Sequence, residues 1–453
     1  MNNFIKIPAV LLTFLVVAKV ALPVEPHVAP LNPKSHVLDI TVEGAGAYQI
    51  SMWVPAGSTS DSVPGIAHVI EHLKFKNHDG DGFSAFDAIP GSSSNAATTY
   101  RTTRYDLNVP PSGVTNALAI LSAMTKSLAV DEGDVKLEKS VVAQELLQRT
   151  QSDPDTPFYQ EFYSALYEGL PYEHSPGGTQ ESVASVTLND VMAFDRANYK
   201  DSKVFVLIAG PALSTINQSA IKHFFPEAAI GTLNVSRKLE LTRDDAELKG
   251  FENFLPKLSD VVLHVSELQR EKTSPRARNI KIILSKIISA PTTWRAVAAA
   301  NILQDAVRSR LPEGLQDRIA EDNRLVQDWS FSISRLMENV WQIDFSASVE
   351  SGVTPELVRA AFEKYVVDIS ATGLSQKSFD RLKSRNFLLS EWESAEARSS
   401  TLGSDTVTYG YEKALNFTDE LQKTQLPDVN DLLRSLQKPG RVGQLLLKPE
   451  GTS

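Results

Sequence analysis

The segment GIAHVIEHLKF, residues 65–75, carries two histidines four positions apart and a glutamate directly before the second one. Positions i and i+4 of an α-helix lie on the same face, so His68 and His72 could donate ring nitrogens to one metal ion. Glu71, three positions after His68, would lie beside them, close enough to polarise a metal-bound water. Imidazole ligands suit zinc, and the chain has no cysteine to favour a softer site. A surface helix that binds no metal is the alternative interpretation.

The helix predicted at residues 134–152 offers the third protein ligand that a catalytic zinc usually takes. Glu138 and Glu145 are seven positions apart and lie on nearly one face, with Val141 and Val142 between them. Carboxylates on a packed face need a cation or hydrogen-bond partners. One glutamate could bind the metal while the other holds a histidine in the required tautomer. An exposed stripe of two glutamates is the alternative.

The elements around these motifs alternate between strands and helices. The motif helix is predicted to begin near Pro64, a residue suited to a first turn. The first half contains predicted strands at 36–42, 48–57, 98–110 and 204–210, and predicted helices at 112–130 and 134–152. The second half contains predicted strands at 280–287 and 340–350, and predicted helices at 293–311, 354–369 and 376–397. Strands followed by helices occur twice, which indicates two similar α+β domains.

Composition limits the class of protein. A chain of 453 residues is too long for one ordinary core, and 42% hydrophobic with 22% charged residues is typical of a soluble globular protein. The formal net charge of −10 argues against nucleic-acid binding, which needs a basic face. Because cysteine is absent, disulfides, thiolate metal sites and cysteine nucleophiles are excluded.

The N-terminal segment, residues 1–22, has the pattern of a secretory signal peptide. One lysine, Lys6, precedes the apolar run Ile7–Ala18, which has the length of the apolar core of a secretory signal peptide and is short for a membrane span. No arginine precedes Arg101, which argues against a mitochondrial transit peptide. The pattern predicts export, with an uncleaved N-terminal anchor or a buried N-terminal helix as alternatives.

Three separated stretches resemble the insulinase/pitrilysin zinc metallopeptidases, an inverzincin family with the H-x-x-E-H motif. Residues 53–76 resemble the family's strand, Gly-Ser turn and G-x-A-H-x-x-E-H-x-x-F pattern. Residues 92–105 resemble its Asn-Ala-x-Thr segment, and residues 138–146 its E-x-x-V-V-x-x-E helix. The three stretches follow the family's order within about residues 37–215. The second half resembles the family only in length and pattern.

The resemblance implies a role for each residue of the predicted site. His68, His72 and Glu145 would bind one zinc ion per chain, and Glu71 would be the general base that activates the zinc-bound water. Glu138 would be the carboxylate that supports a histidine ligand from behind. The expected reaction is zinc-assisted hydrolysis of a peptide bond.

The resemblance also implies how a substrate would be held. Asn95 and Ala96 would lie on the edge strand against which an extended peptide is laid. Relatives often carry an arginine and a tyrosine in the second half that bind the scissile carbonyl. Residues 315–332 occupy that region here and include Arg318 but not the tyrosine. Two later tyrosines could substitute, although such residues usually belong to the core: Tyr409 and Tyr411.

The predicted fold class is α+β, with two similar α/β-sandwich domains, each an antiparallel-rich sheet with helices packed on one face. Together they would form half of a clam-shell metallopeptidase. The predicted order is a signal peptide or anchor at 1–22, a spacer at 23–36, a catalytic zinc-peptidase domain at 37–225, an interdomain connection at 226–275 and a second domain without zinc at 276–447. Short family members assemble as homo- or heterodimers, so a partner chain is expected.

The function predicted from the sequence is that of an exported, periplasmic zinc endopeptidase that cleaves short or unfolded peptides. The alternative is a non-catalytic or partner-dependent structural or regulatory subunit of the same family. The complete set of His68, Glu71, His72 and Glu145 favours the enzyme. No nucleic-acid partner is expected, and membrane association is expected only if the N-terminal segment stays uncleaved.

Overall fold

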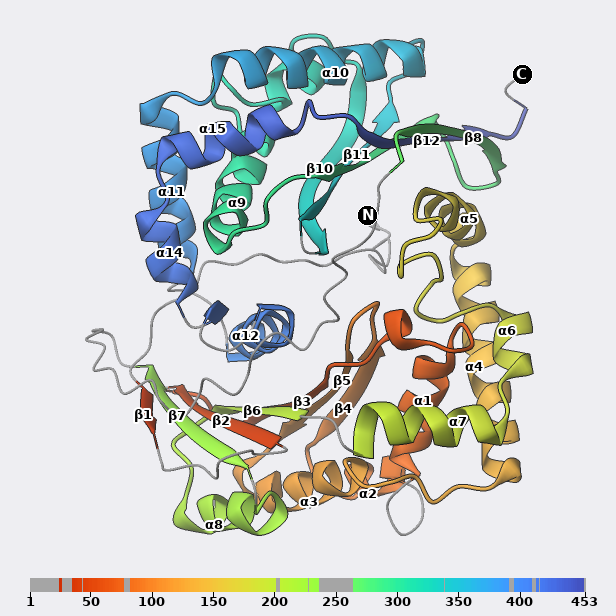
Figure 1. The fold of residues 1–453 in the computed structure, drawn as a ribbon, viewed down its shortest axis with the longest axis vertical. Helices are drawn as coiled ribbons and strands as arrows, with labels where there is room; N and C mark the ends of the chain where they lie inside the picture. Colours follow the sequence, from red (N-terminus) through yellow and green to blue (C-terminus); the bar gives the residue numbers. More distant parts are fainter. Residues whose placement is uncertain are drawn as a thin grey trace, which may run out of the picture.

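The chain folds into two layered halves, one around each of two sheets (Figure 1). The computed structural model describes residues 24–26, 35–42, 44–76, 82–200, 204–226, 228–235, 264–337, 339–390, 395–409, 413–414 and 416–451. The predicted signal peptide at 1–22 lies outside these residues. None of the helices within the described ranges has both the length and the apolar character that crossing a membrane requires.

The first half contains a seven-stranded mixed sheet with the order β1-β7-β2-β6-β3-β5-β4. Its strands are β1 (Val24–Pro26), β2 (Ser35–Val42), β3 (Tyr48–Val54), β4 (Ser93–Thr98), β5 (Thr103–Val109), β6 (Val204–Gly210) and β7 (Ala229–Val235). β6 is buried along its whole length between β2 and β3, as its continuous apolar sequence predicts. β4 is the outermost strand of the sheet, so one of its edges is not paired with another strand of the sheet.

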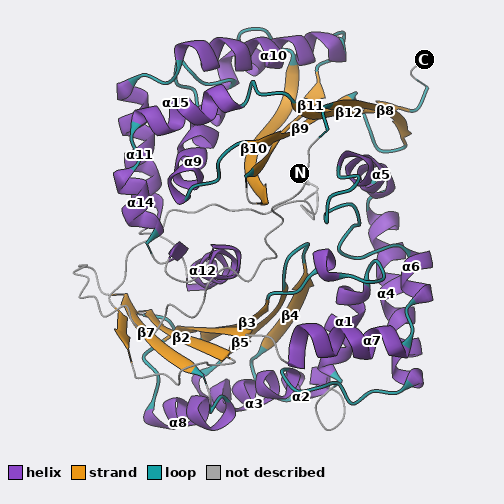
Figure 2. Ribbon diagram, in the orientation of Figure 1, coloured by secondary structure: helices purple, strands orange, loops and turns teal. Residues whose placement is uncertain are grey.

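Helices cover one face of this sheet (Figure 2). They are α1 (Ile66–Phe75), α2 (Gly82–Asp87), α3 (Val114–Met124), α4 (Glu132–Ser152), α6 (Gln180–Ser185), α7 (Leu188–Asp195) and α8 (Thr215–Phe224), while α5 (Thr156–Leu166) packs against the second sheet instead. Alternate residues of β3, such as Ile50 and Met52, pack in one core with Ile66 and Ile70 of α1. This core fixes α1 against the sheet, and α4 packs on α1 in turn.

The second half repeats the plan with a five-stranded sheet of order β10-β11-β9-β12-β8. Its strands are β8 (Ser266–Ser274), β9 (Lys281–Ser289), β10 (Val326–Met337), β11 (Val340–Val349) and β12 (Gly440–Pro449). Its helices are α9 (Trp294–Arg308), α10 (Pro355–Thr372), α11 (Gln376–Ser390), α12 (Ala395–Tyr409), α14 (Phe417–Lys423) and α15 (Leu426–Ser435). The predicted α+β class with two similar domains and helices packed on each sheet is confirmed.

The two sheets share one arrangement of strands. The order β4-β5-β3-β6-β2 in the first corresponds to β10-β11-β9-β12-β8 in the second, and in both the last pair is parallel and the others are antiparallel. The position of α1, after β3 and before β4, therefore corresponds to that of α9, after β9 and before β10.

The two halves meet in a buried aromatic joint. Tyr163 and Tyr167 of the first half pack against Ile283 and Ile287 of β9. The Tyr167 hydroxyl donates a hydrogen bond of 2.6 Å to the Gln342 side chain on β11. This combination of apolar contact and a buried hydrogen bond joins the halves.

Helix α12 extends from the second half over the face of the first sheet that α1 leaves open (Figure 2). Gly403 lies directly on the Trp53 indole, and Arg104 donates a hydrogen bond of 2.8 Å to the Ser400 hydroxyl. Only a residue without a side chain fits over Trp53, because a Cβ at position 403 would lie 2.2 Å from the indole nitrogen. Both faces of the first sheet are thus covered.

Several predicted boundaries differ from the observed ones. Residues 98–110, predicted as one strand, contain the end of β4, a tight turn and β5. The turn forms because the Thr99 hydroxyl bonds to the backbone of Thr102, which reverses the chain. The range 226–275, predicted as a connection, contains β7 and β8, which belong to different sheets. The range 23–36, predicted as a spacer, contains β1 and the first residues of β2.

Candidate metal centre

The motif helix α1 is fixed at its N-terminus by a carboxylate. Asp61 accepts hydrogen bonds from the backbone nitrogens of Gly65, at 2.7 Å, and Ala67, at 3.1 Å. These are among the first N–H groups of a helix, which have no partner within the helix itself. Burial raises the pKa of Asp61 to about 7, although both backbone bonds oppose the rise.

A glycine turn packs against the start of the same helix. Gly178, with φ of +67°, lies so close to α1 that a Cβ there would stand 2.5 Å from the Pro64 carbonyl oxygen. Gly65, with φ of +90°, faces the Gly177 carbonyl in the same way. The turn thus sets the position from which α1 begins.

Helix α4 carries the two acidic residues opposite α1. It begins with a reciprocal capping box between Asp131 and Asp134, and its buried Val142 and Leu146 pack in the core of the first half. Glu138 and Glu145 therefore both face α1. Glu138 is buried, while the Glu145 side chain is 35% exposed.

One carboxylate oxygen of Glu145 faces both histidines. Its Oε2 atom lies 3.3 Å from Nε2 of His68 and 3.5 Å from Nε2 of His72. The two imidazole rings stand nearly perpendicular, with centroids 5.0 Å apart. Three ligand atoms thus converge on one point from two helices, and this donor set of two imidazoles and one carboxylate fits a catalytic zinc ion.

Glu138 lies behind the site and contacts the other nitrogen of one histidine. Its Oε2 is 3.3 Å from Nδ1 of His72, and its Oε1 is 3.2 Å from Nζ of Lys76. A carboxylate in this place can fix the imidazole so that its Nε2 is directed toward Glu145. Although burial acts to raise the pKa of Glu138, His72 and Lys76 outweigh it, and the pKa is lowered.

The electrostatics of the site favour a positive charge between the carboxylates. Burial alone would lower the pKa of His72, but hydrogen bonds to Glu138 and Glu145 and the charge of Glu71 raise it to about 9. Hydrogen bonds from His68 and His72 hold the pKa of Glu145 well below its usual range against the effect of burial. Both carboxylates therefore remain ionised, as metal ligands and their supporting groups must be.

Glu71 lies next to the point where the three ligand atoms converge, but its hydrogen bond goes to the strand β4 and not to the helix α4. It forms a compact group with His68 and His72, with one possible ligand atom from each residue within 4.8 Å of the others. Its Oε2 accepts a hydrogen bond of 2.6 Å from the Thr98 hydroxyl at the end of β4. The Glu145 oxygen, within 3.5 Å of both Nε2 atoms, is therefore well placed to be a third ligand beside the two histidines.

The predicted substrate residues lie on the edge strand next to this site. Asn95 is exposed and Ala96 is partly buried on β4, the outermost strand, which also contacts α1. Thr98 on the same strand was not singled out from the sequence. The only sequence signal for it is its place as the threonine of the Asn-Ala-x-Thr segment, since its contact with Glu71 joins residues 27 positions apart.

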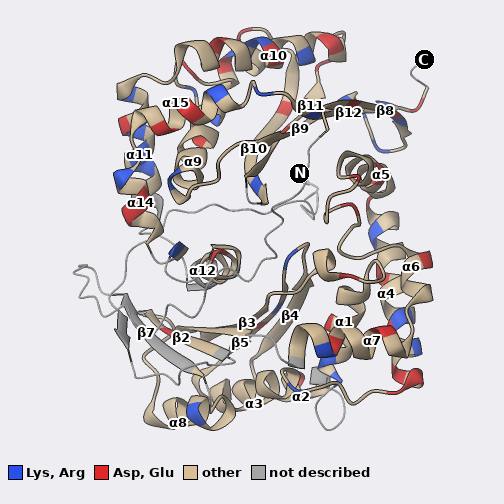
Figure 3. Ribbon diagram, viewed as in Figure 1, with Lys and Arg blue, Asp and Glu red and all other residues tan. Residues whose placement is uncertain are grey.

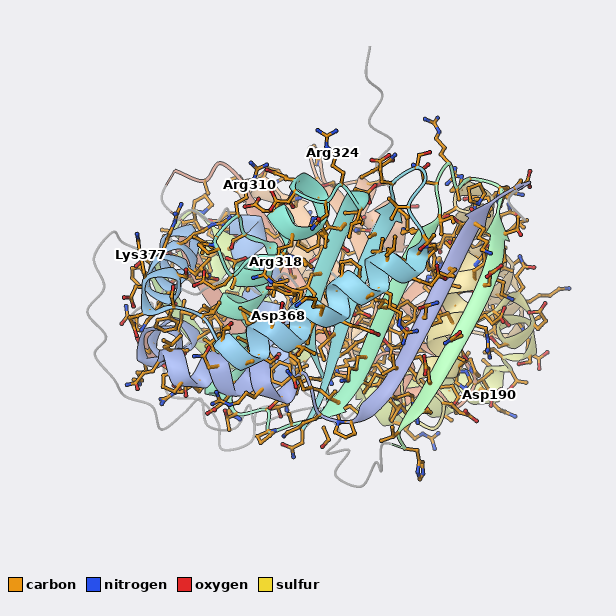
Figure 4. The ribbon with its side chains drawn as sticks, turned by 90° about the horizontal axis from the view of Figure 1, so that it is seen from above. Asp190, Arg310, Arg318, Arg324, Asp368 and Lys377 are labelled. Atoms are coloured by element: carbon orange, nitrogen blue, oxygen red, sulfur yellow. The ribbon has the colours of Figure 1, made fainter. Side chains whose placement is uncertain are left out.

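Neither Arg318 nor Tyr409 of the second half is placed at this site. Arg318 lies 3.6 Å from Asp368 and over the Tyr365 ring, on the side of the second half seen in Figure 4. Tyr409 is buried against Trp294, so it belongs to the core. Tyr411 lies outside the described residues.

Several known sequences similar to the chain are named as zinc proteases. A family model described as insulinase, peptidase family M16, matches residues 41–179, which include every residue of the site. The zinc protease PqqE of Helicobacter pylori is 29% identical over 195 residues, 42% of this chain and 44% of that protein. An uncharacterized zinc protease of Mycobacterium bovis is 23% identical over 427 residues, 89% of this chain and 88% of that protein.

Solved structures share the fold over nearly the whole chain. A protease from Helicobacter pylori superposes with a TM-score of 0.72 at 20% identity, covering 95% of this chain and 100% of that chain. An M16 inactive domain from Pseudomonas fluorescens gives 0.69 at 15% identity, covering 95% and 99%. The first half of the periplasmic protease PqqL from Escherichia coli gives 0.68 at 16% identity, covering 95% and 93%, and this chain matches 48% of complete PqqL.

Proposed function

Because the chain belongs to the insulinase family of M16 peptidases, we propose that it is an exported zinc-dependent endopeptidase that cleaves short or unfolded peptides bound in extended form. One observation carries this proposal. The Glu145 carboxylate faces Nε2 of both His68 and His72 within 3.5 Å, and Glu71 lies beside them.

In this proposal, His68, His72 and Glu145 hold the zinc ion, and Glu138 keeps His72 in the tautomer that binds. Bound zinc supplies Lewis-acid chemistry, which polarises a carbonyl and makes a nearby water more acidic. Glu71 accepts the proton of the attacking water and afterwards returns it to the leaving amine. A buried carboxylate with one oxygen already hydrogen-bonded by Thr98 is suited to this, because its orientation is fixed before substrate arrives.

The edge strand β4 provides the proposed peptide-binding surface. Its outer edge can pair its backbone N–H and C=O groups with an extended peptide, which would add a strand to the sheet. Asn95 and Ala96 lie on this strand, next to the helix that carries Glu71. Because the proposed substrate lies in extended form along β4, short or unfolded peptides are the proposed substrates.

We further propose export to the periplasm and assembly with a second family chain. The apolar run Ile7–Ala18 after a single lysine supports export, and one neighbour in fold is described as a periplasmic protease. Because this chain matches 48% of complete PqqL, a homodimer or heterodimer would supply the other half. Cell fractionation, N-terminal sequencing and light scattering of the purified chain measure these points.

The test of the activity is hydrolysis of an unstructured fluorogenic peptide by the purified chain. The parent is expected to contain one zinc per chain, to lose activity with a chelator and to regain it with zinc. Glu71→Gln is expected to retain the zinc but to lose about 10²- to 10⁴-fold in kcat, because the metal ligands survive and the general base does not. If Glu71→Gln cleaves as fast as the parent, the assigned role of Glu71 is wrong.

A non-catalytic or partner-dependent subunit is the second candidate, since one neighbour in fold is described as an inactive domain. The same assay separates the two candidates. A chain that binds zinc but cleaves only after a co-encoded family member is added is partner-dependent. A chain that binds zinc and stays inactive with that partner is non-catalytic.

A further inference from the structure

We propose that Thr98 is a positioning residue that keeps Glu71 out of the coordination shell of the metal. This inference rests on the proposed zinc peptidase function and concerns the same site. The Thr98 hydroxyl lies at the end of β4 and donates a hydrogen bond of 2.6 Å to Oε2 of Glu71. Within the described part of the chain, it is the hydrogen-bond donor that holds this carboxylate.

Glu71 needs such a restraint because it is close enough to bind the metal itself. One of its oxygens lies within 4.8 Å of ligand atoms of His68 and His72. A glutamate with a free carboxylate in this place is a good oxygen ligand for zinc. Glu71 bound to the metal would use the position that a water needs and would lose its lone pair as a base.

The Thr98 hydroxyl has a single hydrogen, and Glu71 is its better acceptor. Its other neighbour is Oγ1 of Thr103, at 3.3 Å, and that hydroxyl donates to the Ala56 carbonyl at 2.9 Å. A charged oxygen at 2.6 Å is a better acceptor than a neutral one at 3.3 Å. The hydrogen of Thr98 therefore goes to Glu71.

A row of buried hydroxyls next to Thr98 shows that Thr103 does not donate a hydrogen bond to Thr98. Tyr199 hydrogen-bonds to Thr103, and the hydroxyls of Tyr199 and Tyr105 are 3.0 Å apart. All three side chains are buried, and burial raises the pKa of both tyrosines, so both retain their hydrogens. Thr103 donates its single hydrogen to the Ala56 carbonyl oxygen. Thr103 then presents a lone pair, not a hydrogen, to Thr98.

The location of Thr98 links the base to the proposed substrate strand. Thr98 is three residues after Asn95 on β4, and its backbone pairs with Thr103 on β5. The orientation of Glu71 is therefore set by the strand along which the peptide is proposed to lie. Displacement of the end of β4 would release Glu71 toward the metal.

The experiment compares Thr98→Val with Thr98→Ser and the parent. Valine has the shape of threonine but no hydroxyl, so Glu71 is expected to swing to the metal. We expect kcat to fall about 10- to 100-fold with KM nearly unchanged, because removal of a group that orients a metal site costs about this much. Thr98→Ser, which keeps the hydroxyl, is expected to restore kcat to within about threefold of the parent.

A metal readout tests the same point without turnover. The cobalt-substituted Thr98→Val chain is expected to show weaker visible absorption than the parent, because an added carboxylate raises the coordination number. The double variant Thr98→Val/Glu71→Gln is expected to return toward the parent spectrum, since glutamine is a poor ligand. Thr125→Val, the same isosteric change at the end of α3, is the matched control and should leave spectrum and kcat unchanged.

Each outcome decides the inference. A Thr98→Val chain with the parent's cobalt spectrum overturns it, whatever happens to kcat, and so does a shifted spectrum that the added Glu71→Gln leaves unchanged. If the parent binds cobalt but cleaves no peptide, while Thr98→Val shifts the spectrum and the double variant reverses the shift, the proposed function fails and the inference stands. A parent that binds no metal overturns both.

Discussion

The two halves of the molecule share the order of five strands. They differ in the helix that follows the strand β3 in the first half and the corresponding strand β9 in the second. In the first half that helix is α1, where His68, Glu71, His72 and the buried Lys74 interrupt an apolar face. In the second half it is α9, whose buried residues are alanines, valines, isoleucine and leucine, with Asn301 as the one buried polar residue among those described. The scaffold alone therefore does not make the site.

The difference shows that a charge buried on α1 requires polar partners in the surrounding elements. Lys74 is completely buried, and its Nζ contacts the Asp195 carboxylate at 2.6 Å and the Lys126 carbonyl oxygen at 2.7 Å. A buried charge without partners would destabilise the fold by several kcal/mol. The first half thus has a buried, paired charge on α1, whereas Asn301 is the buried polar residue of α9.

The largest expected effect is a loss of zinc affinity when the site at α1 is changed, compared with a change on α9. Glu145→Ala removes the carboxylate that faces both histidines, and zinc affinity is expected to fall at least about 100-fold, since loss of an orienting partner alone costs 10- to 100-fold. Asn301→Ala, in the corresponding helix of the second half, is expected to leave zinc affinity unchanged. Competition with a chromophoric chelator measures both, and equal losses in the two variants would contradict the assignment of the site.

A smaller effect is expected on folding stability, in a comparison of two glycines that adopt positive φ. Gly178→Ala is expected to destabilise the fold by about 3 kcal/mol or more, because left-handed backbone costs 1–2 kcal/mol and the added Cβ would meet the Pro64 carbonyl oxygen at 2.5 Å. Gly352→Ala, with φ of +81° and no atom within 4 Å of the Cβ, is expected to cost only about 1 kcal/mol. Urea unfolding measures both values. A Gly352→Ala cost equal to that of Gly178→Ala would show that contact with α1 contributes nothing.

The third comparison concerns the pH dependence of stability and the N-termini of the two helices. Asp61 has an ordinary pKa of 3.8 in the unfolded chain and of about 7 in the fold. Between these values the folded chain binds a proton that the unfolded chain has lost, so the free energy of unfolding is expected to fall as pH rises from about 4 to about 7. Asp61→Asn, which keeps one acceptor oxygen, should reduce that slope.

The matched change at α9 is Thr293→Ser. Thr293 caps that helix by accepting a hydrogen bond from Ala296, and a hydroxyl does not titrate in this range. Urea unfolding at several pH values between 4 and 7.5 is therefore expected to give parallel curves for Thr293→Ser and the parent. An unchanged slope in Asp61→Asn would mean that burial does not raise the pKa of Asp61.

Local patterns of the sequence predict the elements that carry the chemistry well. The motif helix was predicted to begin near Pro64 and α1 spans Ile66–Phe75, while the helix predicted at 134–152 is α4, Glu132–Ser152. Both have buried faces that recur at helical spacing. His68 and His72 share one face of α1, so their proximity follows from the helix alone.

Contacts between elements could not be predicted from local patterns of the sequence. The choice of Glu145 over Glu138 as ligand came from the family resemblance, because both lie on one face of α4. The bond from Thr98 to Glu71 depends on how the end of β4 meets α1, and the reversal at Thr99 that separates β4 from β5 was not predicted. The strands β7 and β8 were missed because they flank a charge-rich stretch that was interpreted as a connection.

The place of β12 in the second sheet has a consequence for the order in which the molecule folds. β12, Gly440–Pro449, lies between β9 and β8 and pairs with both, although it follows them by more than 150 residues. Every strand and helix around Glu71 and Glu145 precedes it in the chain. In a chain that folds from its N-terminus during synthesis or transport, the first half can pack early. The second sheet stays open along the β8–β9 seam until its last strand arrives, so truncation within β12 should leave a folded first half beside an incomplete second sheet.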